Sequence, residues 1–370
     1  MPIQLNSQQM RKKKSLESAL QEVEGVKQPS SVNDDSIKQI KLKRSEQPSE
    51  TVFIEKILAG DISYLSRAIT LIESTNPKHK EKANAIIEHC LPYANKSVRI
   101  GITGVPGVGK STFIEVFGKQ FTEKGKKVAV LAIDPSSSIN KGSILGDKTR
   151  MEALVKDPNA YIRPSPSGES LGGVAQKTRE TIILCEAAGF DTIIIETVGV
   201  GQSEIAVHSM VDFFLLLKLA GAGDELQGIK RGIIEMADAI VINKADQDNV
   251  KKANLAKSEF TRALHLYPIK ESKWQPKVNT CSAFYNDGID AVYEIIQDYL
   301  SLTKSNGYFE KKRTAQNKYW LLETINQQLK NNFYNKPSVK EALKKYMEDI
   351  QKLKTTPFKA AEELLKLAKK

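Results

Sequence analysis

A glycine-rich stretch with one lysine and one serine, residues 104–111, fits the spacing Gly-x4-Gly-Lys-Ser. The residues before it, 97–103, predict a short buried strand, and residues 112–119 have the apolar spacing of a helix. Glycines let backbone amides approach a polyphosphate closely, and a helix N-terminus favours negative charge. The segment therefore predicts a phosphate-binding loop for a nucleoside triphosphate, whereas a chance glycine turn would not need this strand and helix.

Within this loop, the lysine and the serine have distinct expected roles. Lys110 is expected to bridge the β- and γ-phosphates and to act in catalysis, and the Ser111 hydroxyl is expected to ligate Mg²⁺. The residues expected to contact the nucleotide here are Gly104, Val105, Pro106, Gly107, Val108, Gly109, Lys110, Ser111 and Thr112.

A second motif, Asn-Lys-Ala-Asp at 243–246, follows an apolar strand. The Asp246 carboxylate can accept from both N1–H and the exocyclic amine of guanine, which adenine does not present in that arrangement. Asn243 adds a polar contact, and the stem of Lys244 can cover the base. Ser282 and Ala283, after the last predicted strand, supply backbone for the guanine oxygen. Because a site built on such hydrogen bonds discriminates strongly, the motif predicts GTP rather than ATP.

A third segment, residues 190–204, combines a buried strand with a glycine-rich turn. The strand delivers Glu196 beside the predicted Mg²⁺ site, and the amide of Gly199 is placed to meet the γ-phosphate. The following residues are expected to rearrange when that phosphate leaves. Gln202 or Glu204 either orients the attacking water or caps the next helix, and both interpretations stay open.

Further charged residues are expected near the same phosphates. Asp134 follows strand 127–133, at the edge where open α/β sheets bind ligands. Asp134, Asp147 and Glu196 would bring three carboxylates to one Mg²⁺, either as ligands through water or by holding a mobile segment. Asp147 has a second interpretation, as a solvated turn residue. In the glycine-rich loop 220–232, Lys230 or Arg231 could reach the transferring phosphate or simply be surface charges at a helix start.

The elements that position these residues predict an α/β fold: a P-loop NTPase with a mostly parallel sheet flanked by helices, and with helical N- and C-terminal extensions. Strands are expected at 98–103, 127–133, 192–196, 212–219, 238–242 and 277–281. The predicted division is a disordered extension over 1–50, a helical segment over 51–95, the nucleotide domain over 96–300 and a helical segment over 301–370. The apolar faces of the last segment pack either on the nucleotide domain or on a second copy, and dimerisation is favoured.

The composition of the chain argues against a disulfide-rich protein, a thiolate metal site and a surface for nucleic acid or membrane. The 370 residues contain three cysteines that lie far apart, which suggests neither a disulfide framework nor a thiolate metal site and fits a reducing, cytoplasmic location. No signal peptide or membrane-spanning segment is expected. The net charge of +11 lies mostly in residues 301–370, with sixteen Lys and Arg against seven Asp and Glu. This favours a solvated helical face over a nucleic-acid or membrane surface.

Taken together, the motifs resemble the methylmalonyl-CoA mutase-associated GTPases of the MeaB/ArgK type over about residues 53–300. The resemblance rests on Gly-Val-Pro-Gly-Val-Gly-Lys-Ser-Thr, Ile-Asp-Pro-Ser-Ser, Gly-Asp-Lys-Thr-Arg-Met, Glu-Thr-Val-Gly-Val-Gly-Gln-Ser-Glu, Gly-Ala-Gly-Asp-Glu-Leu-Gln-Gly-Ile-Lys and Asn-Lys-Ala-Asp. It implies a homodimeric, Mg²⁺-dependent GTPase that binds GTP and GDP and serves as a chaperone. Its implied partner is a cobalamin-dependent acyl-CoA mutase, whose adenosylcobalamin loading it gates and which it protects from inactivation.

The resemblance also assigns switch segments. Asp134 and Asp147 would belong to the first switch, residues 196–204 to the second, and residues 221–230 to a third, partner-responsive switch. The family pattern has a proline where this chain has Ala220, so the entry to the third switch departs from it. Two alternatives remain: a kinase acting on an amino-acid-transport binding protein, and a GTPase acting on ribonucleoprotein or membrane.

Overall fold

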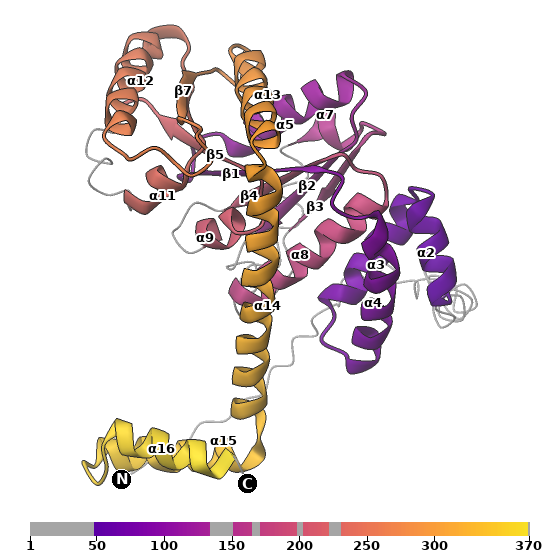
Figure 1. Ribbon diagram of the computed structural model, residues 1–370, viewed down its shortest axis with the longest axis vertical. Helices are drawn as coiled ribbons and strands as arrows, with labels where there is room; N and C mark the ends of the chain where they lie inside the picture. The colour runs from indigo at the N-terminus through magenta and orange to yellow at the C-terminus, as the bar shows by residue number, and fades with distance from the viewer. Residues whose placement is uncertain (1–47, 134–150, 165–170, 198–202, 222–230, 369–370) are drawn as a thin grey trace, which may run out of the picture. The chain divides into compact units, whose positions relative to one another are not determined.

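The computed structural model describes residues 48–133, 151–164, 171–197, 203–221 and 231–368 (Figure 1). The chain divides into two units, Met1–Pro48 and Ser49–Lys370. All the helices and strands that the structure describes lie in the second unit. Apart from residues 48–50, the predicted disordered extension lies outside the described residues.

One sheet of seven parallel strands, in the order β3-β2-β4-β1-β5-β6-β7, forms the centre of this unit. The strands are β1 Val98–Gly104, β2 Val128–Ile133, β3 Ala160–Arg163, β4 Thr192–Thr197, β5 Phe213–Leu219, β6 Ala239–Asn243 and β7 Lys277–Thr280. All six strands predicted from the sequence are present. β3 is missing from that prediction, because four residues with two buried positions are too few to show a pattern.

Helices cover both faces of the sheet, as the alternation of side chains along the strands requires. Along β4, Ile193 and Ile195 join one hydrophobic core and Ile194 joins the other. The Ile194 face is covered by α5 Lys110–Glu123, α7 Glu152–Val155 and α13 Ile289–Ser305. The opposite face is covered by α8 Leu171–Ala187, α9 Ser203–His208, α11 Arg231–Met236 and α12 Val250–His265. A 3₁₀ turn, Gln247–Asn249, precedes α12.

Three helices, α2 Glu50–Leu58, α3 Ile62–Glu73 and α4 Pro77–Cys90, precede the sheet and pack against α8 (Figure 1). Their starts follow from the sequence, because the side chains of Ser49, Asp61 and Asn76 accept hydrogen bonds from the first free backbone amides. A 3₁₀ turn, Leu91–Tyr93, then leads into β1.

The chain ends in α14 Tyr308–Asn335, α15 Pro337–Gln351 and α16 Pro357–Ala368. The first half of α14 buries Phe309, Arg313, Gln316 and Trp320 on one face. The sequence predicts one apolar face that includes Trp320, Leu321, Ile325 and Leu329 and packs either on the nucleotide domain or on a second copy, which is favoured. The structure packs Trp320 on the nucleotide domain, the first of these alternatives, and its Nε1 donates to the carbonyl of Ser209 at 3.2 Å.

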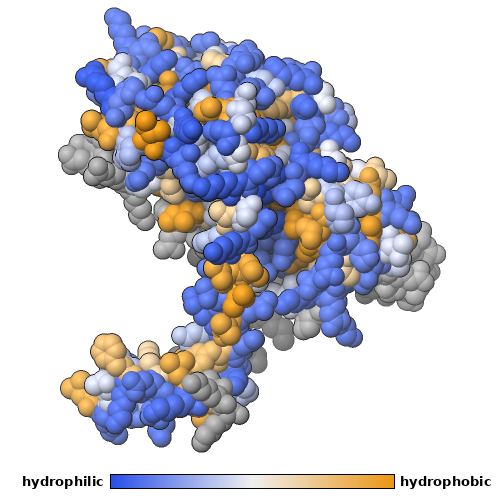
Figure 2. Space-filling view, viewed as in Figure 1, coloured by the Kyte–Doolittle hydropathy of each residue, from blue (hydrophilic) through white to orange (hydrophobic). Residues whose placement is uncertain are grey.

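Beyond Trp320 the helix carries exposed apolar side chains, with Leu321, Leu322, Ile325 and Leu329 each at least 45% exposed. Figure 2 shows such side chains, in orange, along this part of α14 and on the α15–α16 pair. We call the four residues 321, 322, 325 and 329 the distal α14 stripe.

A buried ion pair fastens α14 to the sheet. Arg313 donates from Nε and Nη2 to the two carboxylate oxygens of Asp212 at 2.9 and 2.7 Å, and its guanidinium also donates to the carbonyls of Asn95 and Ser97. The side chains of Arg313 and Asp212 are 4% and 1% exposed. The same Asp212 carboxylate accepts from the backbone amide of Arg99 in β1. Because both carboxylate oxygens of Asp212 accept hydrogen bonds and Arg313 carries the opposite charge, the buried charges are compensated.

We expect Arg313→Ala to lower the free energy of unfolding by about 3–5 kcal/mol, because it leaves Asp212 buried without its cation. Urea denaturation followed by circular dichroism measures this change. Lys277→Ala is the matched control: its ion pair with Asp298 is about half exposed on both sides, so a change of roughly 0.5 kcal/mol or less is expected. Equal effects of the two substitutions would contradict the prediction.

Candidate nucleotide-binding site

The predicted phosphate loop lies between β1 and α5, at the carboxyl edge of the central strand. Two of its glycines are required by their surroundings. A Cβ atom on Gly104 would lie 2.6 Å from the carbonyl oxygen of Leu217 in β5, and Gly109 has a φ of 92°. Glycine alone lets the backbone pass this close to β5 and turn into the helix at no steric cost.

Lys110, the first residue of α5, reaches back into the loop. Its Nζ donates to the carbonyls of Gly104 at 2.9 Å and Val105 at 3.4 Å. Burial lowers the pKa of Lys110, and the carboxylates of Glu196 and Glu204 oppose this shift. The ammonium group of Lys110 therefore contacts the end of β1 and is affected by charges at the end of β4 and the start of α9.

The two carboxylates have different degrees of burial. Glu196 is partly buried at the end of β4, where it lies opposite Ile102 of β1 in the parallel register. Glu204 is only 1% exposed in the first turn of α9. Next to Glu196, the Thr197 hydroxyl donates to the Thr103 hydroxyl at 2.8 Å and joins the ends of the two strands. Both interpretations of Glu204, as the residue that orients the attacking water and as a cap of α9, stay predictions.

Asn243, at the end of β6, connects three parts of the site. Its Nδ2 donates to the carbonyl of Val108 in the phosphate loop at 2.8 Å. Its Oδ1 accepts from the backbone amide of Ala283 at 3.1 Å and from the thiol of Cys281 at 3.4 Å. The contact of Asn243 with the base stays a prediction, and in the structure both of its polar atoms hold the two loops together.

Beside Asn243 lies a pocket of about 310 Å³, which we call the base pocket. It is lined by Gly109, Thr112, Asn243, Lys244, Asp246, Gln247, Ala283, Phe284 and Tyr285. Ser282 donates its hydroxyl to the Asp246 carboxylate and so fixes that side chain. Residues predicted from motifs 130 or more positions apart in the sequence thus form one cavity.

Sequence reasoning missed Gln247, Phe284 and Tyr285. An available signal was the pair of adjacent aromatic residues directly after Ser282 and Ala283. Five predicted site residues, Asp134, Asp147, Gly199, Gln202 and Lys230, lie outside the described residues.

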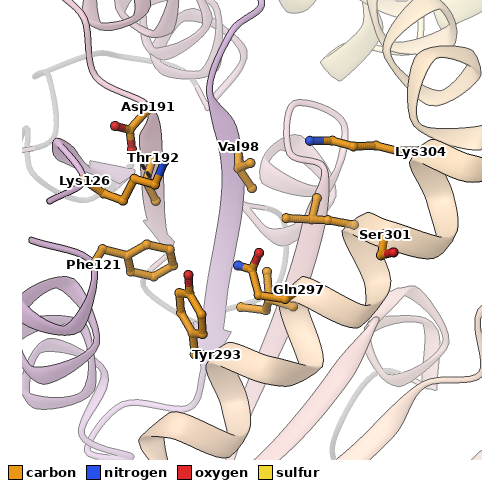
Figure 3. A pocket seen from close by; sticks show the side chains of 11 residues that line it. Val98, Phe121, Lys126, Asp191, Thr192, Tyr293, Gln297, Ser301 and Lys304 are labelled. Carbon is orange, nitrogen blue, oxygen red and sulfur yellow. Dashed lines mark hydrogen bonds between the residues drawn. The ribbon is translucent and has the colours of Figure 1, made fainter. Parts of the chain in front are cut away.

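A second cavity, of about 350 Å³, lies at the opposite edge of the sheet (Figure 3). Its lining includes Val98 and Thr192, which begin β1 and β4, and the side chains of Phe121 and Tyr293 from α5 and α13. Because the phosphate loop leaves β1 at its other end, this cavity is separate from the nucleotide site.

Among the described residues, no helix is long and apolar enough to cross a membrane.

Comparison with known proteins gives a consistent result. The model of the family described as methylmalonyl Co-A mutase-associated GTPase MeaB matches residues 65–338. GTPase ArgK of Escherichia coli is 45% identical over 281 residues, covering 76% of this chain and 85% of the relative. The mitochondrial methylmalonic aciduria type A homolog of Mus musculus is 42% identical over 334 residues, covering 86% and 80%.

A solved crystal structure, described as an LAO/AO transport system kinase, superposes with a TM-score of 0.70 at 35% identity and covers 87% of this chain and 98% of that one. The relatives named as GTPases and this shared P-loop fold agree with the phosphate loop and base pocket described above. The chain therefore belongs to the methylmalonyl-CoA mutase-associated GTPase family and is a GTPase.

Proposed function

We propose that this GTPase is a chaperone of a cobalamin-dependent acyl-CoA mutase, which uses GTP to gate adenosylcobalamin loading and to protect the mutase from inactivation. The observation that carries the proposal is the family match over residues 65–338, whose description names association with methylmalonyl-CoA mutase. The cytoplasmic location stays a prediction from the sequence, since the relative from Mus musculus is described as mitochondrial.

In this proposal Lys110 would hold the triphosphate, and Ser111 and Glu196 would hold its Mg²⁺. Lys110 leaves the loop carbonyls to which it now donates and neutralises the β- and γ-phosphates. Ser111 at the helix start and Glu196 at the strand end would supply oxygen ligands for Mg²⁺. Two protein oxygens fit this ion, because Mg²⁺ usually keeps several waters and takes the rest of its ligands from phosphate. Asp134 and Asp147 remain predicted additions to this set.

The fold offers a route from the nucleotide to the C-terminal helices. α9 begins at Ser203, carries Glu204, whose charge acts on Lys110, in its first turn, and leads into residues 209–212. Three side chains of α14 hold this segment: Trp320 at Ser209, Gln316 at Val211 and Arg313 at Asp212. A rearrangement of α9 on hydrolysis would therefore act on α14 directly, which supports an output on a partner or a second copy.

We expect Asn243→Ala to weaken GDP binding at least tenfold. The substitution leaves the carbonyl of Val108 and the amide of Ala283 without their partner, so the phosphate loop and the base pocket lose their common support. Isothermal titration calorimetry measures the affinity. Asn254→Ala, on an exposed part of α12, is the matched control and should bind GDP like the parent protein. Unchanged affinity of Asn243→Ala would contradict the proposed role.

We expect GTP turnover to be slow for the protein alone and to rise at least tenfold when a cobalamin-dependent acyl-CoA mutase is added. If Lys230 supplies charge to the transferring phosphate, Lys230→Ala should remove most of this rise, since such cations contribute about 10³–10⁵ in rate. Phosphate release measures turnover, with Lys251→Ala as the control for loss of a surface lysine. Equal rates with and without the mutase would rule out the proposed partner.

One observation favours a second candidate function, a kinase, because the superposed crystal structure is described as a transport system kinase. The base pocket, with the Asp246 carboxylate in its wall, speaks against ATP as the donor. Incubation with γ-labelled ATP and GTP separates the two. Transfer of label from ATP to a protein would replace the chaperone proposal, whereas release of free phosphate from GTP alone would retain it.

We also propose that the chain is a homodimer, formed through the distal α14 stripe. These four leucine and isoleucine residues follow helical spacing and stay exposed, which is unusual for a stable monomer surface. A second copy is the natural cover, because a two-fold interface buries the same stripe on both subunits.

Substituting Ile325 and Leu329 by Glu together should convert the dimer to a monomer without loss of GDP binding, because the stripe lies outside the nucleotide site. Light scattering after gel filtration gives the mass. The control is Leu266→Glu, an 88%-exposed leucine in the loop after α12, which should leave the mass unchanged. A parent protein that already runs as a monomer would disprove the dimer proposal.

A further inference from the structure

Two aromatic side chains stand at the rim of the base pocket without apolar cover. Phe284 is 80% and Tyr285 54% exposed, and both line the pocket. Their rings meet edge to face with centroids 5.1 Å apart. Exposed large apolar side chains at a cavity mouth mark a place where a ligand covers them.

The loop that carries these rings is held in one conformation. Ser282 and Asp287 exchange both backbone hydrogen bonds, at 2.9 and 3.0 Å, and so close a short loop with the aromatic pair at its tip. Gly288 follows with a φ of 72°, and a Cβ atom there would lie 2.6 Å from the carbonyl oxygen of Thr280. The rings therefore stand on a rigid support rather than on a free segment.

Hydrogen bonds connect this loop to the residues after β6. Gln247 donates its amide to the Tyr285 hydroxyl at 2.6 Å. Ser282 accepts from the backbone amide of Tyr285 at 3.4 Å and donates to the Asp246 carboxylate. The position of the aromatic pair is thus fixed relative to the carboxylate that is proposed to read the base edge.

A purine in this pocket presents an edge to Asp246 and flat faces to the walls. The Lys244 stem comes from the loop after β6, and Phe284 comes from the loop after β7. A planar base that contacts Asp246 lies between these two loops. Stacking on an aromatic ring contributes substantially to the binding of a base and does not depend on which base it is.

We infer that Phe284 stacks on the guanine ring and sets how long GDP and GTP stay bound, with Tyr285 as the positioning residue that holds the Phe284 ring through the Gln247 hydrogen bond. The inference rests on the proposal that the base pocket holds guanine. In this arrangement Asp246 selects the base and Phe284 supplies affinity that is independent of the base.

The test uses the full chain and fluorescent methylanthraniloyl-GDP, whose release is timed after addition of excess unlabelled GDP. Phe284→Ala should speed release and raise Kd by roughly 5- to 150-fold, with Phe284→Leu between it and the parent protein. Phe358→Ala, which removes an 84%-exposed phenylalanine on α16, is the matched control and should release GDP at the parent rate.

Competition with IDP, which lacks the exocyclic amine, separates stacking from edge recognition. Phe284→Ala should weaken GDP and IDP by the same factor, whereas Asp246→Asn should weaken GDP far more than IDP. Tyr285→Phe should speed release about 2- to 10-fold in the parent protein. It should have no further effect in the Phe284→Ala background if Tyr285 acts through Phe284.

The results separate two questions: whether the base pocket binds guanine, and whether Phe284 stacks on it. If Asp246→Asn leaves GDP affinity unchanged, the assignment of the base pocket is wrong. If Asp246→Asn weakens GDP but Phe284→Ala binds it within twofold of the parent, the pocket stands and the stacking role is overturned. A Phe284→Ala protein that binds GDP normally but no longer responds to the mutase would assign the aromatic pair to a protein contact instead.

Discussion

The hydrogen bonds of the buried Asp212 carboxylate hold the central strands and the C-terminal helices together, and the rest of the structure depends on them. The carboxylate accepts from the backbone amide of Arg99 at the start of β1 and from two nitrogens of Arg313 in α14. The backbone carbonyl of Asp212 accepts from Tyr299 in α13 and Lys312 in α14. One residue thus joins two central strands to helices α13 and α14. Because Asp212 is buried, loss of the Arg313 contact would leave an uncompensated charge at a high cost in free energy.

Asp212 and its partners lie at the amino edge of the sheet, whereas the nucleotide site lies at the carboxyl edge. β1 and β5 connect the two edges, and α9 covers the sheet between them. The nucleotide loops and the contacts that hold α14 therefore lie at opposite edges of the same sheet. Residues 209–212 follow α9 directly and are bonded to α14. A change at the nucleotide site would reach α14 through them.

At the site itself, affinity and selectivity rest on different chemistry. Charged and polar groups at the phosphate loop serve any nucleoside triphosphate, and the Asp246 carboxylate is suited to guanine. Asn243 links the two functions mechanically, since it bonds to both loops. A pocket whose walls come from loops after two neighbouring strands is well suited to such coupling, because parallel strands end at one edge.

The sequence by itself determined the phosphate loop, the guanine motif, the family resemblance and all strands except β3, because each depends on residues close together in the chain. Tertiary structure alone decided the bond between Asn243 and a loop 135 residues earlier, the pairing of Arg313 with Asp212 across 101 residues, and the burial of Trp320. It also brought Phe284 and Tyr285 to the base pocket. Local patterns encode which face of an element is apolar, but the partner of a polar side chain depends on how distant elements pack, and no periodicity in the chain specifies that.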